Sequence, residues 1–141
     1  MPVAVEIASS PLSPALESDL ARIYADYPGF ASAAAAMGVL RDAVATGDTL
    51  YTGLFNAHHI AAVLVRGEGE VRHMRYLCVH GATRGRGVAE RLVAEMRRLE
   101  MARGTQWLEA DFDLAQEGVP DMLLALGFIP HGDGNYRCRL V

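Results

Sequence analysis

The chain has 141 residues, of which 51% are hydrophobic and 21% charged, with a formal net charge of −4 and a pI near 5.7. This length fits one domain, expected to span residues 1–141, and is large enough to bury a core without disulfides. The acidic balance argues against a nucleic-acid-binding surface, and no apolar stretch reaches the ~18 residues typical of a membrane span. No secretory signal is recognisable, so the protein is expected to be cytoplasmic.

The order of the predicted elements indicates a mixed α/β fold. In chain order we expect a strand at residues 3–8, a helix beginning after Ser13-Pro14, a helix at 33–45, strands at 49–55, 60–66 and 71–79, a helix at 87–103, a strand at 106–112, a helix near 119–126 and a strand at 136–141. Serine followed by proline is typical of a helix start, and a glycine such as Gly104 of a helix end. Residues 56–59 are expected to form a four-residue hairpin loop.

The helix at 87–103 is the clearest element because its apolar residues recur at helical spacing. They are Val88, Leu92, Val93, Met96 and Leu99. This helix connects the strand at 71–79 to the strand at 106–112, so these two strands are expected to be parallel neighbours in an otherwise antiparallel sheet. We therefore predict three layers, with helices on both faces of a mixed sheet.

The segment Arg84-Gly85-Arg86-Gly87-Val88-Ala89 lies between a predicted strand and this helix. A helix start has up to four backbone N–H groups without partners, and the helix dipole adds partial positive charge there. The glycines let the backbone approach a bulky anion, and the two arginines can donate charge-assisted hydrogen bonds to phosphate oxygens. The pattern predicts a binding site for a diphosphate.

Other interpretations of this segment are weaker or excluded. An ordinary strand–helix turn with solvated arginines stays open. A Rossmann dinucleotide site is disfavoured because the glycine spacing differs and the preceding strands form a meander. A P-loop is excluded because the sequence lacks Gly-Lys-Ser/Thr at this point.

With these residues and Leu124-Ala125-Leu126-Gly127-Phe128, the sequence resembles the GCN5-related N-acetyltransferase (GNAT) superfamily over most of its length. The resemblance implies a GNAT-like three-layer fold that holds acetyl-CoA in a V-shaped opening between the fourth and fifth strands. Backbone groups near Leu77 and Val79 are expected to pair with the pantetheine arm like an added strand. N–H groups from Arg84, Gly85, Arg86, Gly87, Val88 and Ala89 are expected to hold the pyrophosphate.

Candidate catalytic residues lie on the two strands beside this opening. Strict alternation predicts that His73 and Arg75 share a face with the later strand residues Leu77 and Val79, with Tyr76 on the opposite face.

Three acidic side chains alternate on the neighbouring strand: Glu109, Asp111 and Asp113. Together they predict an acidic wall that attracts a cationic amine, with Asp111 as a candidate base acting through water. Alternatively, Asp111 and Asp113 pair with nearby arginines.

The proton donor common in the superfamily is absent from its usual position. The resemblance places a tyrosine acid five residues before the phenylalanine of the Leu-Gly-Phe ending, and this position is Leu123. The five histidines lack a metal-ligand spacing, so no metal is expected. Cys78 and Cys138 are expected to be free, buried thiols.

Within the superfamily, the chain is similar to the PanZ (PanM) group of small acetyl-CoA-binding factors that promote maturation of aspartate decarboxylase. Residues that carry this likeness are Asp19-Leu20, Ile23-Tyr24, Phe55-Asn56, Ala61-Ala62-Val63, Thr83-Arg84 and Arg86-Gly87-Val88. The likeness implies that Asn56 contributes to partner docking, although Leu54 stands where an arginine is expected.

Two functions therefore stay open. The prediction is acetyl transfer from acetyl-CoA to an amine of a small molecule or protein, and the alternative is a non-catalytic acetyl-CoA sensor that binds a partner protein. The acceptor, the acyl-chain preference and the oligomeric state stay open as well, and a homodimer is common among relatives.

Overall fold

The computed structural model describes residues 2–111, 119–132 and 134–140. Its elements, in chain order, are β1 (Ala4–Ile7), α1 (Pro14–Ile23), α2 (Ala33–Ala45), β2 (Thr49–Phe55), β3 (His58–Arg66), β4 (Val71–Val79), the 3-10 helix η1 (Gly81–Thr83), α3 (Val88–Arg103), β5 (Trp107–Asp111), α4 (Val119–Ala125), β6 (Ile129–Pro130) and β7 (Asn135–Arg139). This order agrees with the one expected from the sequence, with β6 as a short additional strand.

The strands form one sheet in the order β1-β2-β3-β4-β5-β7-β6. The pair β4–β5 is parallel and is connected by α3, whereas every other neighbouring pair is antiparallel. The predicted mixed sheet with one parallel pair is therefore confirmed.

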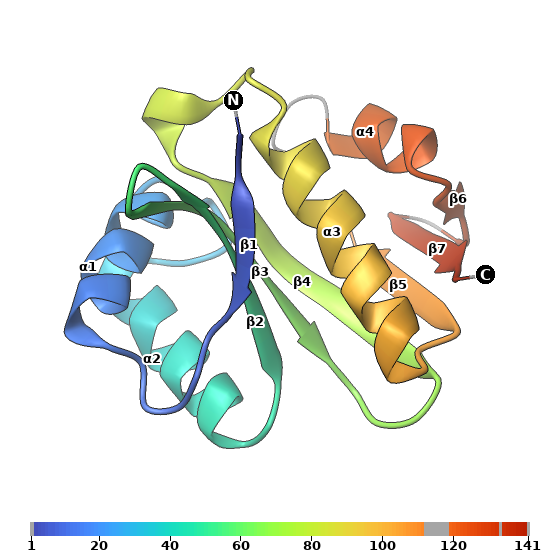
Figure 1. The fold of residues 1–141 in the computed structure, drawn as a ribbon, viewed down its shortest axis with the longest axis horizontal. Helices are drawn as coiled ribbons and strands as arrows, with labels where there is room; N and C mark the ends of the chain where they lie inside the picture. Colours follow the sequence, from blue (N-terminus) through green and yellow to red (C-terminus); the bar gives the residue numbers. More distant parts are fainter. Residues whose placement is uncertain (1, 112–118, 133, 141) are drawn as a thin grey trace.

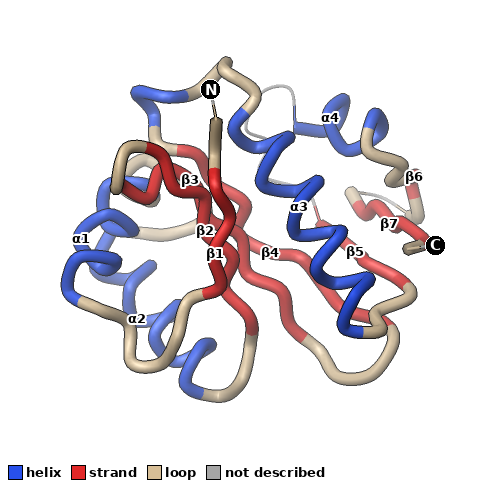
Figure 2. The backbone as a smooth tube through the Cα atoms, viewed as in Figure 1, coloured by secondary structure: helices blue, strands red, loops and turns tan. Residues whose placement is uncertain are grey.

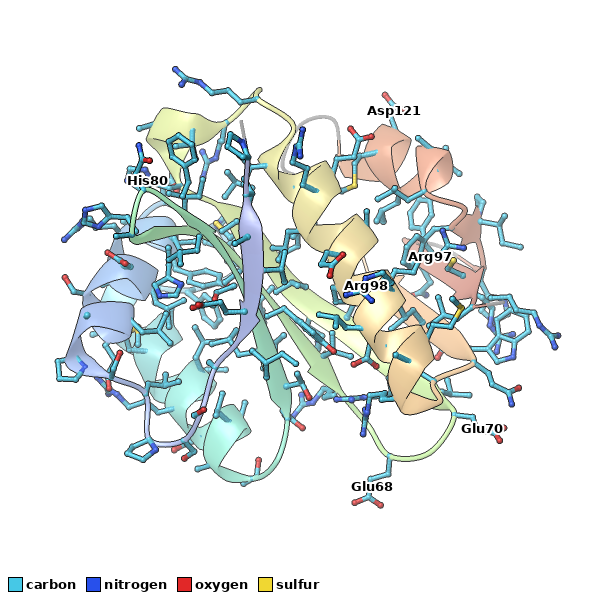
Figure 3. All side chains as sticks on the ribbon, in the orientation of Figure 1. Glu68, Glu70, His80, Arg97, Arg98 and Asp121 are labelled. Carbon is cyan, nitrogen blue, oxygen red and sulfur yellow. The ribbon has the colours of Figure 1, made fainter. Side chains whose placement is uncertain are left out.

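Helices cover both faces of the sheet, and each face has its own core (Figures 1 and 2). On one side, α3 and α4 pack Leu92, Met96 and Leu123 against β3, β4 and β5. On the other side, α1 and α2 pack Leu20 and Leu40 against β2, β3 and β4. These two cores confirm the three-layer arrangement. Arg97 reaches from α3 toward the C-terminal strands (Figure 3), where its Nη1 donates to the Leu126 carbonyl at 2.9 Å.

The helix ends follow the signals expected from the sequence. The Ser13 hydroxyl caps α1 by accepting from the Leu16 N–H at 3.1 Å, and proline occupies the first turn. Gly104 ends α3 with a φ of 104°, which a residue with a side chain rarely adopts. No helix among the described residues is both long and apolar enough to cross a membrane.

The hairpin between β2 and β3 is tighter than the sequence predicted. Its turn consists of two residues, Asn56 and Ala57, with φ values of 50° and 65°. His58 and His59 belong to β3 and not to a four-residue loop. Both turn residues have positive φ, as in the type I′ turns that match the twist of paired strands, and asparagine tolerates this conformation.

A β-bulge in β4 overturns the predicted side-chain alternation. Leu64 of β3 pairs with Arg75, but Ala62 pairs with Cys78, so β4 contains one extra residue there. Tyr76 has a φ of 57° at this point. In consequence Leu77 faces α3, whereas His73 lies on the opposite face with Arg75 and Tyr76; the predicted common face was wrong.

Near the C-terminal end of α3, a buried polar network connects the helix to the sheet. Glu100 is completely buried and accepts from the Tyr51 hydroxyl, from the Thr105 hydroxyl at 2.8 Å and from Arg72 Nη1 at 3.3 Å. The Arg72 guanidinium also donates to the Val65 carbonyl at 2.8 Å. Both partners of the ion pair thus make further hydrogen bonds, as a buried charge requires, although Arg72 Nε is buried without a hydrogen-bond partner among the described residues.

Candidate functional site

The strands β4 and β5 pair over only part of their length. Val71–Met74 pairs in parallel with Trp107–Ala110, and the following β4 residues, Arg75–Val79, lie beyond this ladder. On its other edge this segment stays bonded to β3. The edge of Arg75–Val79 that faces away from β3 can therefore pair with an extended ligand, as in β-strand addition.

This segment leads directly into a glycine loop, defined as residues 80–87, which connects β4 to α3. Gly85 and Gly87 have φ values of 78° and 75°, and a Cβ at either would meet no described atom within 4 Å. Gly87 is the N-cap of α3, and among the described side chains none caps this end. The first intrahelical bond is from Arg91 N to Gly87 O.

The N–H groups of Val88, Ala89 and Glu90 precede that first bond, so they have no partner within the helix. The helix dipole adds partial positive charge at the same place. The Val88 side chain is buried in the core with Leu77 and Val79, whereas Ala89 is half-buried. The Val88 side chain thus packs the turn against the core, while the backbone N–H groups of the turn stay available to an anion.

The two arginines of the loop differ in their contacts. The Arg84 guanidinium donates to the Val79 carbonyl through Nε at 3.0 Å and to both carboxylate oxygens of Asp26, at 2.8 and 3.0 Å. This hydrogen bond lowers the pKa of Asp26 and raises that of Arg84. Arg86 is exposed and makes no hydrogen bond or ion pair with the part of the chain that the structure describes. Arg86 is therefore the freer cation at this site.

The two described acidic side chains of the predicted acidic wall each contact a basic residue. Glu109 and Asp111 share a face as expected, but Asp111 Oδ2 is 2.9 Å from His73 Nε2 and Glu109 is 3.5 Å from Arg137 Nε. Asp113 lies outside the described residues. The partner of Asp111 is a histidine on β4, not an arginine, and the pair lies beside the last rung of the β4–β5 ladder.

The two remaining predicted positions lie apart from this pair. Leu123, in α4, is completely buried in the α3-side core. Asn56 is exposed in the β2–β3 turn. This hairpin lies at the same end of the sheet as the glycine loop (Figure 1), since His80 N donates to the Ile60 carbonyl at 2.7 Å. Among the described residues, no group of three or more histidine, cysteine or acidic side chains could hold a metal ion.

Sequence reasoning missed two residues just after α1 that support the site. Asp26 contacts the glycine loop, and the Tyr24 hydroxyl donates to the Tyr76 carbonyl at the bulge, at 2.6 Å. Both contacts join residues more than 50 positions apart, so no local pattern indicates them.

Comparison with solved structures defines the class of fold. The ribosomal-protein-S18-alanine N-acetyltransferase from Escherichia coli superposes with a TM-score of 0.77 at 12% identity, covering 97% of this chain and 94% of that one. The Escherichia coli GNAT family N-acetyltransferase YhbS, in complex with CoA, gives 0.73 at 18% identity, with 99% and 82% covered. A GNAT family acetyltransferase from Elizabethkingia anophelis with acetyl-CoA bound gives 0.71 at 13% identity, with 98% of both chains covered. These likenesses show that the fold is that of the GNAT acetyltransferases.

The sequence itself assigns the chain more narrowly. The family model described as the acetyltransferase (GNAT) domain PanZ matches residues 3–136. The chain belongs to this PanZ family of GNAT domains. No curated protein matches the sequence at a significant level.

Proposed function

We propose that this protein binds acetyl-CoA at the end of β4 and the start of α3. The observation that carries the proposal is the continuous path of backbone donors and acceptors from the open edge of Arg75–Val79 through the glycine loop to the uncapped start of α3. The pantetheine arm would lie along the strand edge and the diphosphate at the helix start. Bound acetyl-CoA would supply an acetyl group on a thioester.

The residues at this path fit such a ligand. Gly85 and Gly87 leave open space beside the backbone, which lets a bulky phosphate approach the N–H groups. Arg86 has no competing partner among the described residues and can donate to a phosphate oxygen. The CoA and acetyl-CoA complexes of the two GNAT structures named above support the same assignment.

We further propose that binding, and not transfer, is the main role, with acetyl-CoA as the signal for docking of a partner protein. Leu123 supports this choice: the position is completely buried and has no proton to donate to a departing thiolate. By likeness to the PanZ group, the partner is aspartate decarboxylase. Asn56, exposed in a turn at the same end of the sheet as the glycine loop, is a candidate contact residue.

Acetyl transfer is the second candidate, and the His73–Asp111 pair favours it. A carboxylate on one ring nitrogen orients an imidazole so that its other nitrogen can accept a proton. The pair lies where β4 and β5 separate, beside the strand edge assigned to the ligand. In this function His73 would accept a proton from an amine, and water would protonate the thiolate.

Calorimetric titration with acetyl-CoA tests the binding proposal. We expect saturable 1:1 binding that Arg86→Ala weakens by about tenfold, the loss expected for one hydrogen bond between charged groups. Arg98→Ala is the control, because Arg98 pairs with Glu95 on its own helix, away from the loop. Absence of wild-type binding contradicts the proposal.

Two further assays separate the proposed roles. A sensor shows acetyl-CoA-dependent binding of aspartate decarboxylase, weakened by Asn56→Ala, and releases no CoA with a panel of amines. An enzyme releases CoA with at least one of them. The sequence contains 13 arginines and no lysine, so this protein has no side-chain amine that could itself accept the acetyl group.

A further inference from the structure

Asp26 connects the turn after α1 to the glycine loop through a two-pronged contact. Its Oδ1 accepts from Arg84 Nη2 at 2.8 Å and its Oδ2 from Nη1 at 3.0 Å, while Arg84 Nε donates to the Val79 carbonyl at 3.0 Å. The planar guanidinium therefore connects the last residue of β4 to a turn that lies 58 residues before Arg84 in the sequence. A bidentate carboxylate fixes the direction of the guanidinium as well as its position.

The backbone that carries Asp26 is itself fixed to β4. Tyr24 is fully buried, and its hydroxyl donates to the Tyr76 carbonyl at the bulge. One residue earlier, the Ile23 carbonyl accepts from Cys78 Sγ at 3.1 Å. The side chain of Asp26 thus extends from a turn held against the strand, although the carboxylate itself is exposed.

The glycine loop gains most from such an external support. Two of its glycines are in the left-handed region, and glycine loses more conformational freedom on ordering than any other residue. Thr83 hydrogen-bonds within the loop, to the His80 carbonyl, whereas Arg84 bonds to the turn after α1. A loop that is already ordered in the free protein loses less conformational entropy when the ligand binds.

We propose that Asp26 is a positioning residue of the acetyl-CoA site: it holds Arg84 so that the glycine loop keeps the conformation in which its backbone donors face the diphosphate. The inference rests on the proposed binding of acetyl-CoA. It assigns the Arg84 side chain to the support of the loop, and leaves the direct phosphate contact to Arg86 and the backbone.

The charge of Asp26 makes the proposal easy to test, because two effects have opposite signs. Removing a negative charge near an anion site strengthens anion binding if electrostatics alone matter. Removing a positioning contact weakens binding. We expect Asp26→Asn to weaken acetyl-CoA binding by about three- to fivefold, within the range that exposed ion pairs contribute.

Titration calorimetry with acetyl-CoA compares the wild type, Asp26→Asn, Arg84→Gln and the double variant. The matched control is Glu17→Gln, which breaks a carboxylate–arginine contact between α1 and α2, to Arg41, and also removes one negative charge. We expect no change for the control, and no further loss when Asp26→Asn is added to Arg84→Gln.

An Asp26→Asn affinity equal to or above that of the wild type overturns the proposal, as do additive losses in the double variant. A larger decrease in melting temperature for Asp26→Asn than for Glu17→Gln would show that the contact serves general stability, and this would also overturn the proposal. A wild type that does not bind acetyl-CoA contradicts the proposed function instead, so the two failures are distinguishable.

Discussion

Asp111 Oδ2 and His73 Nε2 lie 2.9 Å apart, joining the two parallel strands of the sheet at the point where their ladder ends. Both side chains are partly exposed. The contact explains why the acidic strand beside the proposed ligand path is not an open acidic wall. It also gives the most direct way to separate sensing from transfer.

We expect Asp111→Asn and His73→Ala to bind acetyl-CoA within about twofold of the wild type, because neither side chain belongs to the diphosphate site. A sensor has no turnover to lose. If the protein is an enzyme, the wild type releases CoA with an amine, and His73→Ala reduces this rate by about 100-fold or more, as expected for loss of a general base. This result would establish transfer. Calorimetry and a thiol-release assay measure the two quantities on the same preparations.

Leu123→Tyr tests whether the buried position can become a proton donor. Leu123 is fully buried in the core, so the larger ring overpacks it and lowers the free energy of unfolding by about 1–3 kcal/mol. The control Leu124→Tyr, at a neighbouring position that is 47% exposed, stays within about 0.5 kcal/mol of the wild type. Urea unfolding measures both variants. A gain of CoA release in Leu123→Tyr without loss of stability contradicts the expectation.

Gly85→Ala and Gly69→Ala form a matched pair. Both glycines have a φ of 78°, and a Cβ at either meets no described atom within 4 Å. Alanine in this conformation costs about 1–2 kcal/mol, which appears as lost stability or is relieved by a change of loop conformation. For Gly85 alone, such a change removes the binding-competent loop, so we expect acetyl-CoA affinity to fall by up to about tenfold. Equal affinities for the two variants would exclude the glycine loop from the site.

The network around Glu100 is expected to dominate the stability of the α3 side. Glu100→Ala leaves Arg72 buried without its carboxylate, which costs about 3–5 kcal/mol. Glu95→Ala, on the same helix but in an exposed pair with Arg98, costs at most about 1 kcal/mol. Denaturant unfolding of both variants checks the difference. A Glu100→Ala protein as stable as Glu95→Ala would show that the buried pair is dispensable.

Tyr51 predicts how stability changes at high pH. Burial and its hydrogen bond to Glu100 raise the pKa of Tyr51 above the usual value of about 10. Above pH 10 the unfolded chain therefore loses the proton first, and the free energy of unfolding falls by up to about 1.4 kcal/mol per pH unit for this group. In Tyr51→Phe we expect a shallower fall between pH 10 and 11. Part of the fall persists, because burial also raises the pKa of Tyr24.

Much of the fold was predictable because its signals are local. The serine cap of α1, the apolar stripe of α3 and the glycines at both ends of α3 depend on residues a few positions apart. The parallel pair followed from one crossover helix. For the same reason the path formed by the end of β4, the glycine loop and the start of α3 could be inferred from a single continuous segment.

The errors arose where a non-local or unusual backbone contact decides the geometry. No side-chain pattern near Tyr76 indicates the bulge, so alternation failed from His73 to Leu77. In the hairpin, Ala57 adopts a positive φ that its residue type does not favour. Asp26 was missed because its partner, Arg84, is 58 residues away in sequence.

Because of the bulge, the residues of β4 that face α3 are even-numbered at one end of the strand and odd-numbered at the other. Before it, the even-numbered residues Arg72 and Met74 face α3; after it, the odd-numbered Leu77 and Val79 do. Deleting one residue at the bulge would remove the extra residue and leave a regular strand in which both ends keep their faces. Deleting one residue elsewhere in β4 would instead turn one end of the strand over, exchanging Arg72 with His73 or Leu77 with Cys78, so this strand tolerates a shorter length only at the bulge.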